Sequence, residues 1–156
     1  EEVKDGMDIA LCSLEENVLK YAGAHNPLWL IRHKDLGPID GVSDENIRKF
    51  ESNNFIIYEI KANKQPIGKF FDPKPYTTHT MKVQKGDSIY IFSDGYVDQF
   101  GGEKGKKFKA KAFRELLLSI QTRSMDEQQQ IITDNFISWR GDLEQIDDVC
   151  VIGVKI

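Results

Sequence analysis

Residues 89–102 read IYIFSDGYVDQFGG, an apolar run that ends in an aspartate followed by a glycine. β-Branched and aromatic residues, which fill residues 89–92, are typical of strands. A carboxylate is costly inside a protein core, so Asp94 is expected where the strand reaches solvent. The stretch therefore predicts a buried strand over residues 88–93 that carries an acid at its end.

Composition limits the class of protein. The chain has 156 residues, of which 40% are hydrophobic, and this suits one globular domain with its own core. The formal net charge of -4, without a dense Lys/Arg patch, argues against a nucleic-acid partner. No apolar run approaches the roughly 20 residues of a membrane span, and residues 1–5 lack the features of a signal peptide. We expect a soluble domain with no membrane segment.

The two cysteines point to a reducing compartment. Cys12 and Cys150 lie in strand-like apolar runs and have no spacing typical of a metal site. We expect both to be reduced residues of the core, which favours a cytoplasmic protein.

Alternating apolar and polar residues predict strands near the amino terminus. Residues 8–14 and 18–22 are separated by a short polar turn, which indicates a hairpin. Residues 28–32 form a third apolar run that starts after Pro27. We expect these three strands to form a meander.

The middle of the chain has a weaker pattern. Residues 55–60 and 77–83 resemble strands. Residues 35–54 are interpreted as a loop with a turn of helix at residues 44–50, and residues 65–75 as a second loop because of their Pro and Gly content.

The period of the apolar residues changes after residue 107. Residues 108–120 and 125–139 have apolar side chains at steps of three and four, which predicts two amphipathic helices. Ser124, with Asp126 and Gln128 close behind it, is a plausible start for the second helix.

The chain closes with one more apolar run. Residues 147–156 are almost wholly apolar after their two acids, which predicts a strand covered on both faces. Strands followed by helices, without a repeat or linker, indicate a single α+β domain.

Aspartates stand at the ends of two predicted strands. Asp94 follows residues 88–93, and Asp147 and Asp148 precede the last strand. Carboxylates held by rigid strand ends next to water suit hard divalent cations. The alternative is that Asp94 with Gly95 is an ordinary turn and that the later pair merely begins a strand. Asp98 is either a further acid of the site or a solvated side chain.

Other kinds of site fit the sequence less well. The acids around Asp94 lack the spacing of an EF-hand or of a haloacid dehalogenase phosphatase. Residues 101–107 lack the Walker spacing and are interpreted as a flexible basic loop. No serine or cysteine has the context of a nucleophile, and His25 is interpreted as a turn residue with local hydrogen bonds.

Five fragments in a fixed order resemble one family. They are Asp5-Gly6-Met7, residues 21–28 (YAGAHNPL), residues 66–68 (PIG), residues 85–98 (KGDSIYIFSDGYVD) and residues 147–149 (DDV). The fragments resemble the SpoIIE-like serine phosphatases, a branch of the metal-dependent protein phosphatase (protein phosphatase 2C) superfamily. The resemblance covers nearly the whole chain.

The resemblance implies a fold and a chemistry. The fold would be an antiparallel β-sandwich flanked by helices, and two Mn²⁺ or Mg²⁺ ions would activate a water that attacks phosphoserine or phosphothreonine. Asp94 matches the family's metal ligand in the Ser/Thr-Asp-Gly motif, and Asp147 matches its late metal aspartate. Asp148 takes the place next to that ligand. Two cations lower the pKa of the attacking water, which agrees with the lack of a protein nucleophile.

The resemblance also implies that part of the site is missing. The family supplies its other metal aspartates from earlier segments, which have no counterpart here, so residues 1–156 are expected to be the C-terminal part of one truncated domain. We expect little turnover and weak metal binding from this chain alone. Missing strands would leave a sheet edge exposed, for which dimerisation or exchange of elements is an expected remedy.

Three hypotheses for the function follow. In the first, the intact protein is an enzyme that dephosphorylates a bacterial regulatory protein, commonly an anti-sigma-factor antagonist in this family, under the control of an upstream sensor domain. In the second, the chain is a phosphatase-like module that binds its partner without catalysis. In the third, it is a structural domain whose acids are incidental.

Overall fold

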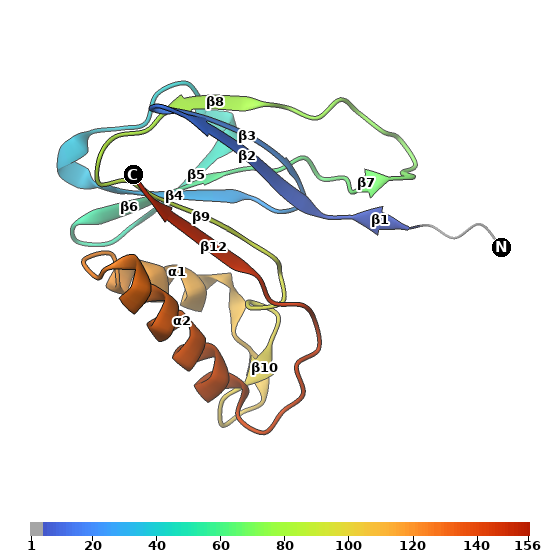
Figure 1. Cartoon of the computed structure of the whole chain (residues 1–156). Helices are drawn as coiled ribbons and strands as arrows, with labels where there is room; N and C mark the ends of the chain where they lie inside the picture. The colour runs from blue at the N-terminus through green and yellow to red at the C-terminus, as the bar shows by residue number, and fades with distance from the viewer. Residues whose placement is uncertain (1–4) are drawn as a thin grey trace.

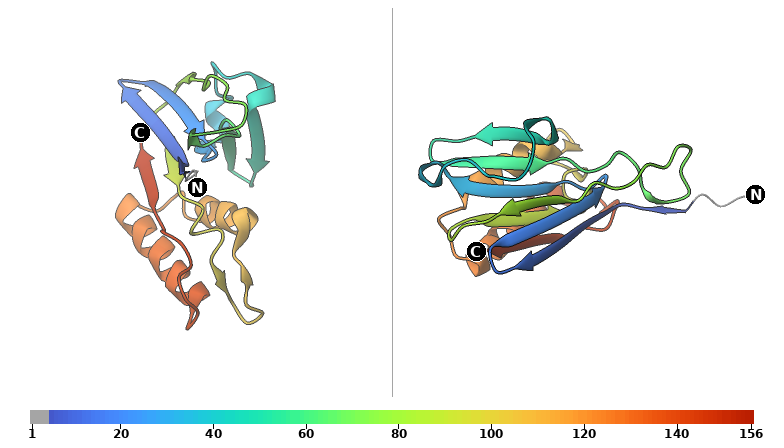
Figure 2. Two further views of the ribbon diagram at one scale, coloured as in Figure 1. Left: turned by 90° about the vertical axis from the view of Figure 1, so that its right-hand side faces the viewer. Right: turned by 90° about the horizontal axis from the view of Figure 1, so that it is seen from above.

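Three layers make up the molecule, and the computed structural model describes them over residues 5–156. A three-stranded sheet lies above a five-stranded sheet, and two helices cover the lower face of the larger sheet (Figure 1). The view turned about the vertical axis shows the same order of layers (Figure 2). Residues 1–4, which contributed to the expectation about a signal peptide, lie outside the described residues. No helix in residues 5–156 is long and apolar enough to cross a membrane.

All neighbouring strands in the sheets are antiparallel. The five-stranded sheet has the order β12 (Val151–Lys155), β9 (Ser88–Phe92), β4 (Leu28–His33), β6 (Phe55–Ile60) and β5 (Ile47–Glu51). The three-stranded sheet has the order β2 (Ile9–Glu15), β3 (Val18–Ala24) and β8 (His79–Lys82). Two short ribbons pair β1 (Gly6–Met7) with β7 (Ile67–Gly68), and β10 (Phe100–Gly101) with β11 (Lys106–Lys107). The helices are α1 (Lys109–Ser119) and α2 (Met125–Arg140), and the two 3-10 turns are η1 (Lys34–Leu36) and η2 (Asp44–Asn46). The α+β sandwich predicted from the sequence is confirmed.

The central strands contribute side chains to two separate hydrophobic cores. On β4, Leu28 and Leu30 pack between the two sheets, whereas Trp29 and Ile31 pack against the helices. The same alternation occurs on β9, where Ile89 faces the other sheet and Tyr90 faces the helices. A strand covered on both faces needs apolar residues at every position, which explains the continuous apolar runs of β4 and β9.

The second helix begins after Ser124, as the sequence predicts, but the capping partner of Ser124 is Glu127 rather than Gln128. The Ser124 hydroxyl accepts a hydrogen bond from the Glu127 N–H at 3.2 Å, and the Glu127 carboxylate accepts one from the Ser124 N–H at 2.9 Å. This capping box satisfies two N–H groups that have no partner within the helix. Gln128, the partner suggested by the sequence, is instead buried and accepts a hydrogen bond from the Tyr90 hydroxyl.

A buried ion pair joins β4 to the turn that precedes β9. Arg32 and Asp87 are 2% and 0% exposed, and the guanidinium donates to both carboxylate oxygens at 2.9 and 2.7 Å. The carboxylate also accepts the Gln84 N–H at 2.7 Å, while Arg32 donates to the Pro38 carbonyl at 2.9 Å. The Lys85-Gly86-Asp87 segment, which the sequence identifies only as a turn, therefore anchors a charge network inside the protein.

The predicted meander is wrong. β2 and β3 form the expected hairpin, but β4 crosses to the other sheet and pairs with β6 and β9. His25 has a left-handed backbone (φ 61) and donates its N–H to the Asn63 carbonyl at 2.9 Å, which turns the chain away from β3. The crossing gives β4 a central position with cover on both faces.

The interpretation of residues 35–54 as a loop is also wrong in part. Residues 44–46 form the 3-10 turn η2, but Ile47–Glu51 is the strand β5, which pairs with β6 along its whole length. β5 is an edge strand on which only Ile47 and Phe50 are partly buried, so its sequence is mostly polar. Within the loop predicted for residues 65–75, Ile67–Gly68 pairs with β1.

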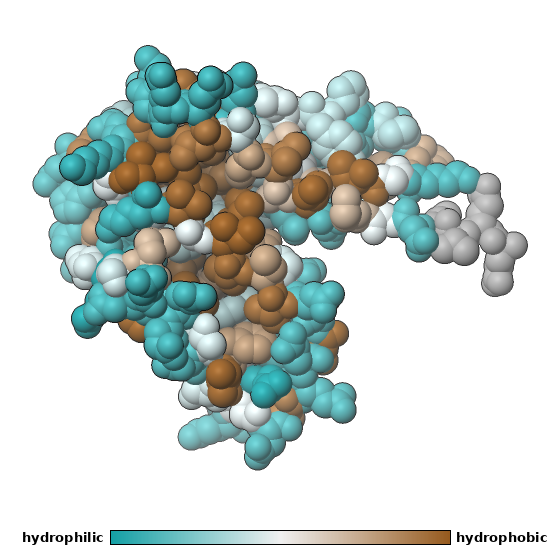
Figure 3. Space-filling view, in the orientation of Figure 1, coloured by the Kyte–Doolittle hydropathy of each residue, from teal (hydrophilic) through white to brown (hydrophobic). Residues whose placement is uncertain are grey.

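The last strand is less covered than its sequence predicts. β12 lies at the edge of the five-stranded sheet, and its Ile152 and Val154 are 49% and 43% exposed. Figure 3 shows hydrophobic surface over β2 and β12 on this side of the molecule. Cys150 is exposed rather than part of the core, while Cys12 is half-buried, and both are free thiols. The strand is thus apolar on a face that the described residues leave open.

Candidate active site

The antiparallel pairing of β9 with β12 brings the predicted acids to one place. Val151 lies opposite Phe92, so the end of β9 meets the start of β12. Asp94 follows β9 by two residues, and Asp147 and Asp148 lie just before β12. Acids separated by more than fifty positions in the sequence therefore share one end of the sheet.

Ser93 fixes the two strand ends to each other. Its hydroxyl donates to the Asp148 carbonyl at 2.8 Å and accepts the Cys150 N–H at 3.0 Å. Its own N–H donates to the Cys150 carbonyl at 3.0 Å. The sequence alone shows no role for this serine, because its partners are 55 and 57 positions away.

Gly95 permits the close approach of these segments. A methyl group at this position would lie 2.2 Å from the Asp148 carbonyl oxygen and 2.8 Å from its carbon. Both contacts are with backbone, which cannot rotate away as a side chain can. Asp94 to Asp98 form a turn in which the Asp98 N–H donates to the Asp94 carbonyl at 2.9 Å. The interpretation of Asp94-Gly95 as a turn is thus confirmed, and it is compatible with a site at the same position.

Gly95→Ala is expected to separate the end of β9 from the start of β12. The added methyl has to displace the Asp148 backbone, and the Ser93 hydrogen bonds have to lengthen with it. We expect a loss of roughly 1–3 kcal/mol of unfolding free energy, the range for overpacking a tight site. Urea unfolding of the variant measures this loss. A Gly95→Ala protein as stable as the wild type would show that the approach is not tight.

Acidic side chains gather at this end of the sheet. Loss of solvation raises the pKa of Asp94, and the negative charges of Asp147 and Asp98 raise it further. A hydrogen bond between the carboxyl groups of Asp94 and Asp147 acts in the same direction. Asp148 contributes through its backbone, since its N–H donates to the Asp147 carboxylate at 2.7 Å.

This donor set fits part of a divalent metal site. Hard cations prefer carboxylate oxygens, and a cation between two carboxylates removes the repulsion that raises their pKa. Within residues 5–156, however, no group of three or more His, Cys, Asp or Glu side chains is arranged to hold a metal ion. Asp94 and Asp147 form a pair, and Asp98 lies 3.4 Å from the Lys107 ammonium.

Lys107 belongs to a hairpin that borders the acids. β10 and β11 form a two-stranded ribbon in place of the flexible loop expected at residues 101–107. The ribbon packs on Trp139 of α2, and a methyl on Gly101 would lie 1.9 Å from the Trp139 carbonyl oxygen. The Trp139 indole also donates to the Gln99 carbonyl at 2.9 Å. The hairpin therefore has a fixed place beside the acid pair.

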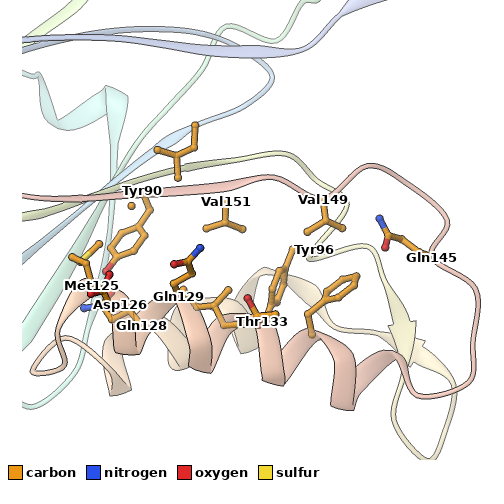
Figure 4. Close-up of a pocket in the computed structure, with 14 residues that line it drawn as sticks. Tyr90, Tyr96, Met125, Asp126, Gln128, Gln129, Thr133, Gln145, Val149 and Val151 are labelled. Carbon is orange, nitrogen blue, oxygen red and sulfur yellow. Dashed lines mark hydrogen bonds between the residues drawn. The ribbon is translucent and has the colours of Figure 1, made fainter.

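A cleft of about 610 Å³ lies between β12 and α2. Tyr90, Tyr96, Val149 and Val151 line its upper side, and Thr133 and other residues of α2 line the lower side (Figure 4). The Tyr96 hydroxyl donates to the Ile132 carbonyl at 2.8 Å, which holds the turn after Asp94 on the helix. The cleft therefore lies next to the acids, because Val149 follows Asp148 and Tyr96 lies two residues after Asp94.

His25 stands at the same end of the sandwich. Its Nδ1 lies 2.7 Å from the Asp8 carboxylate, and its backbone N–H donates to the Asn63 carbonyl. His25 thus lies at a turn, as predicted, but these hydrogen bonds are made with residues that are distant in the sequence rather than with local ones.

The amino-acid sequence of the chain matches a known protein family. The sequence profile of the family Stage II sporulation protein E (SpoIIE) matches residues 6–156. A search of curated proteins gives no significant match. The match to this family therefore extends over almost the whole chain.

Solved phosphatase domains have the same fold. The SiaA-PP2C domain of Pseudomonas aeruginosa superposes with a TM-score of 0.68 at 23% identity, over 90% of this chain and 47% of that one. The phosphatase domain of the cell fate determinant SpoIIE from Bacillus subtilis, presoaked with Mn, gives a TM-score of 0.57 at 14% identity, over 97% of this chain and 56% of that one. The chain therefore spans about half the length of these solved domains. Together with the match over residues 6–156, the shared fold shows that the chain belongs to the SpoIIE family of phosphatases.

Proposed function

We propose that the chain is part of a metal-dependent protein phosphatase that acts on phosphoserine or phosphothreonine. The observation that carries this proposal is the meeting of the Asp94 and Asp147 carboxyl groups at two strand ends that Ser93 ties together. Carboxylates that rigid strands hold close to each other against their own repulsion suit a cation better than they suit a structural role.

The residues of this chain would supply half of a dinuclear centre of Mn²⁺ or Mg²⁺. Asp94 and Asp147 would provide carboxylate ligands, with Asp148 at the adjoining position. The ions, when bound, supply an activated water and neutralise the charge of the phosphoryl group. The β9 and β12 backbones would hold the ligands in place, and Gly95 would keep the two ligand segments close.

The other ligands would come from elsewhere in the protein. We propose that residues 1–156 form the C-terminal part of one phosphatase domain, which the length of the solved relatives supports. The substrate would be a phosphorylated cytoplasmic regulatory protein, such as an anti-sigma-factor antagonist, and a sensor domain would control the activity. This part of the proposal rests on the family resemblance.

Hydrolysis of a phosphoserine peptide by the full-length protein tests the proposal. We expect phosphate release to depend on Mn²⁺ or Mg²⁺ and to stop when EDTA is added, because the activated water requires the metal. The 156-residue chain alone is expected to release little or no phosphate. Activity that persists in EDTA would contradict the proposal. A full-length protein that binds phosphoproteins without hydrolysing them would instead support a non-catalytic module.

A further inference from the structure

An arm projects from the sandwich beyond the ends of its sheets. We define the arm as residues 61–78 together with β1, which pairs with β7 inside it (Figures 1 and 2). Phe71 is 101% exposed, and Phe70 and Tyr76 are 42% and 38% exposed. Met7 and Ile67 on the ribbon are 54% and 41% exposed. Five large apolar side chains within one short projection are unusual on a surface that serves no contact.

Internal hydrogen bonds hold the arm in one shape. Gln65 is 5% exposed, and its amide donates to the Lys74 carbonyl at 2.5 Å and accepts the Lys74 N–H at 3.0 Å. The Tyr76 hydroxyl donates to the Pro66 carbonyl at 2.5 Å, and the Asn63 side chain accepts the Thr77 N–H at 3.0 Å. A loop that is closed in this way presents Phe71 at little further cost in conformational entropy when a partner binds.

The charge of the arm is opposite to that of the whole chain. Residues 61–78 contain four lysines and one aspartate, whereas the chain as a whole has a net charge of -4. A depression of about 380 Å³ is lined by residues that include Phe70, Phe71, Lys64 and Lys74, and also by Asp72, which lies 3.8 Å from the Lys74 ammonium. Its lining combines aromatic surface with two ammonium groups and one carboxylate, and this net positive charge complements an apolar and acidic partner.

The arm leaves the sandwich at the end that carries the acid pair. Asn63, at its base, bridges Ala24 at the end of β3 and binds the N–H of His25. Leu28 lies opposite Ile60, and Trp29 lies opposite Tyr90, so the end of β9 is at the same edge. The space-filling view shows a recess below the arm, between it and the helical layer (Figure 3). A protein that bound the arm would therefore lie next to Asp94 and Asp147.

We propose that the arm is the docking surface for the phosphoprotein substrate. It binds an apolar and acidic surface beside the phosphorylated residue, and Phe71 is the central contact. Lys64 and Lys74 attract the negative charge that acidic residues and the phosphate group supply. The inference rests on the proposed function, since it assigns a substrate-binding element to the same site.

Phosphorylated casein, an acidic phosphoserine protein, is the probe for the test. Phe71→Ala is expected to weaken its binding to the 156-residue chain about tenfold, measured by fluorescence anisotropy, as for the loss of a central interface residue. In the full-length protein the same substitution is expected to raise KM for casein by about the same factor. The kcat for casein and the hydrolysis of p-nitrophenyl phosphate, which is too small to reach the arm, should stay unchanged. Lys64→Glu should weaken casein binding more at low salt than at high salt.

Two controls separate docking from other roles of the arm. Leu11→Ala removes a side chain that is 65% exposed on β2, and Lys20→Glu reverses an exposed charge on β3, and both should leave casein binding unchanged. Equal binding of casein by the wild type and Phe71→Ala would overturn the inference. A change of molecular mass or melting temperature in Phe71→Ala would also overturn it, because the arm would then cover a second copy or another part of the same protein. If neither probe is hydrolysed, the proposed function fails, and the binding measurement still decides the role of the arm.

Discussion

Asp94→Asn is expected to lower the metal-dependent turnover of the full-length protein by about a hundredfold to a thousandfold, the range for losing one preorganised electrostatic partner of a reaction. Asparagine has nearly the same shape as aspartate, but it lacks the charge that a divalent cation requires. The Asp94 side chain lies at the surface, and its backbone position depends on Ser93 and Gly95, so the fold should not change. Initial rates of phosphate release at saturating Mn²⁺ measure the effect.

Asp134→Asn is the matched control for this substitution. Asp134 is exposed on α2 and accepts a hydrogen bond from Gln130 at 2.8 Å, away from the acid pair. Its loss should change turnover by less than about twofold, as for a surface substitution away from the site. Equal rates for the wild type and Asp94→Asn would remove Asp94 from the mechanism.

The largest effect on stability is expected from Asp87→Ala. Arg32 is 2% exposed, and removal of the carboxylate leaves its guanidinium buried without an opposite charge. The Gln84 N–H loses its acceptor at the same time. Breaking one side of a buried ion pair costs about 3–5 kcal/mol, a large part of the stability of a small domain. Urea unfolding of the 156-residue chain measures the loss.

A double substitution tests whether the loss arises from the unpaired charge. In Arg32→Met with Asp87→Leu, apolar side chains replace both members of the pair, and the cost should be much smaller than for Asp87→Ala alone. The guanidinium also binds the Pro38 carbonyl, so some loss remains in the double variant. If Asp87→Ala unfolds at the same urea concentration as the wild type, the ion pair does not stabilise the fold.

Local patterns were sufficient to predict most of the elements. The β2–β3 hairpin and both helices follow from apolar periodicity, because their apolar side chains face one core. β6 and β9 follow from continuous apolar runs, because these strands contribute to both cores. The pairing of the strands does not follow from periodicity. The chain turns at His25 through a hydrogen bond to Asn63, and a contact over this separation leaves no mark in a local pattern.

The edge strands show a second limit. β5 has few apolar residues because it is largely exposed, whereas β12 is rich in apolar residues although much of it is exposed. Apolar content indicates that a surface tends to be buried, but it does not identify what buries it. Within the described residues nothing covers the outer edge of β12.

The acids of the site were visible in the sequence, whereas the groups that position them were not. Asp94 and Asp147 stand out because they lie at the ends of apolar runs, and the structure brings them to the same end of the sheet, where the charge of Asp147 raises the pKa of Asp94. The link through Ser93 joins segments 55 and 57 positions apart, and the pair of Arg32 with Asp87 joins segments 55 positions apart. Ser93 lies in the Ser-Asp-Gly motif and Asp87 in the Lys-Gly-Asp motif, but only the tertiary structure shows which residues their side chains bind.

The central claim is that Asp94 and Asp147 are ligands of one metal centre. Titration of Mn²⁺ into the full-length protein, followed by electron paramagnetic resonance of the free ion, tests this claim without any substrate. The account predicts that the wild type binds Mn²⁺ and that Asp94→Asn and Asp147→Asn each weaken the binding at least about tenfold, the lower range for loss of groups that tune a metal site. Equal Mn²⁺ binding by the wild type and both variants would contradict it.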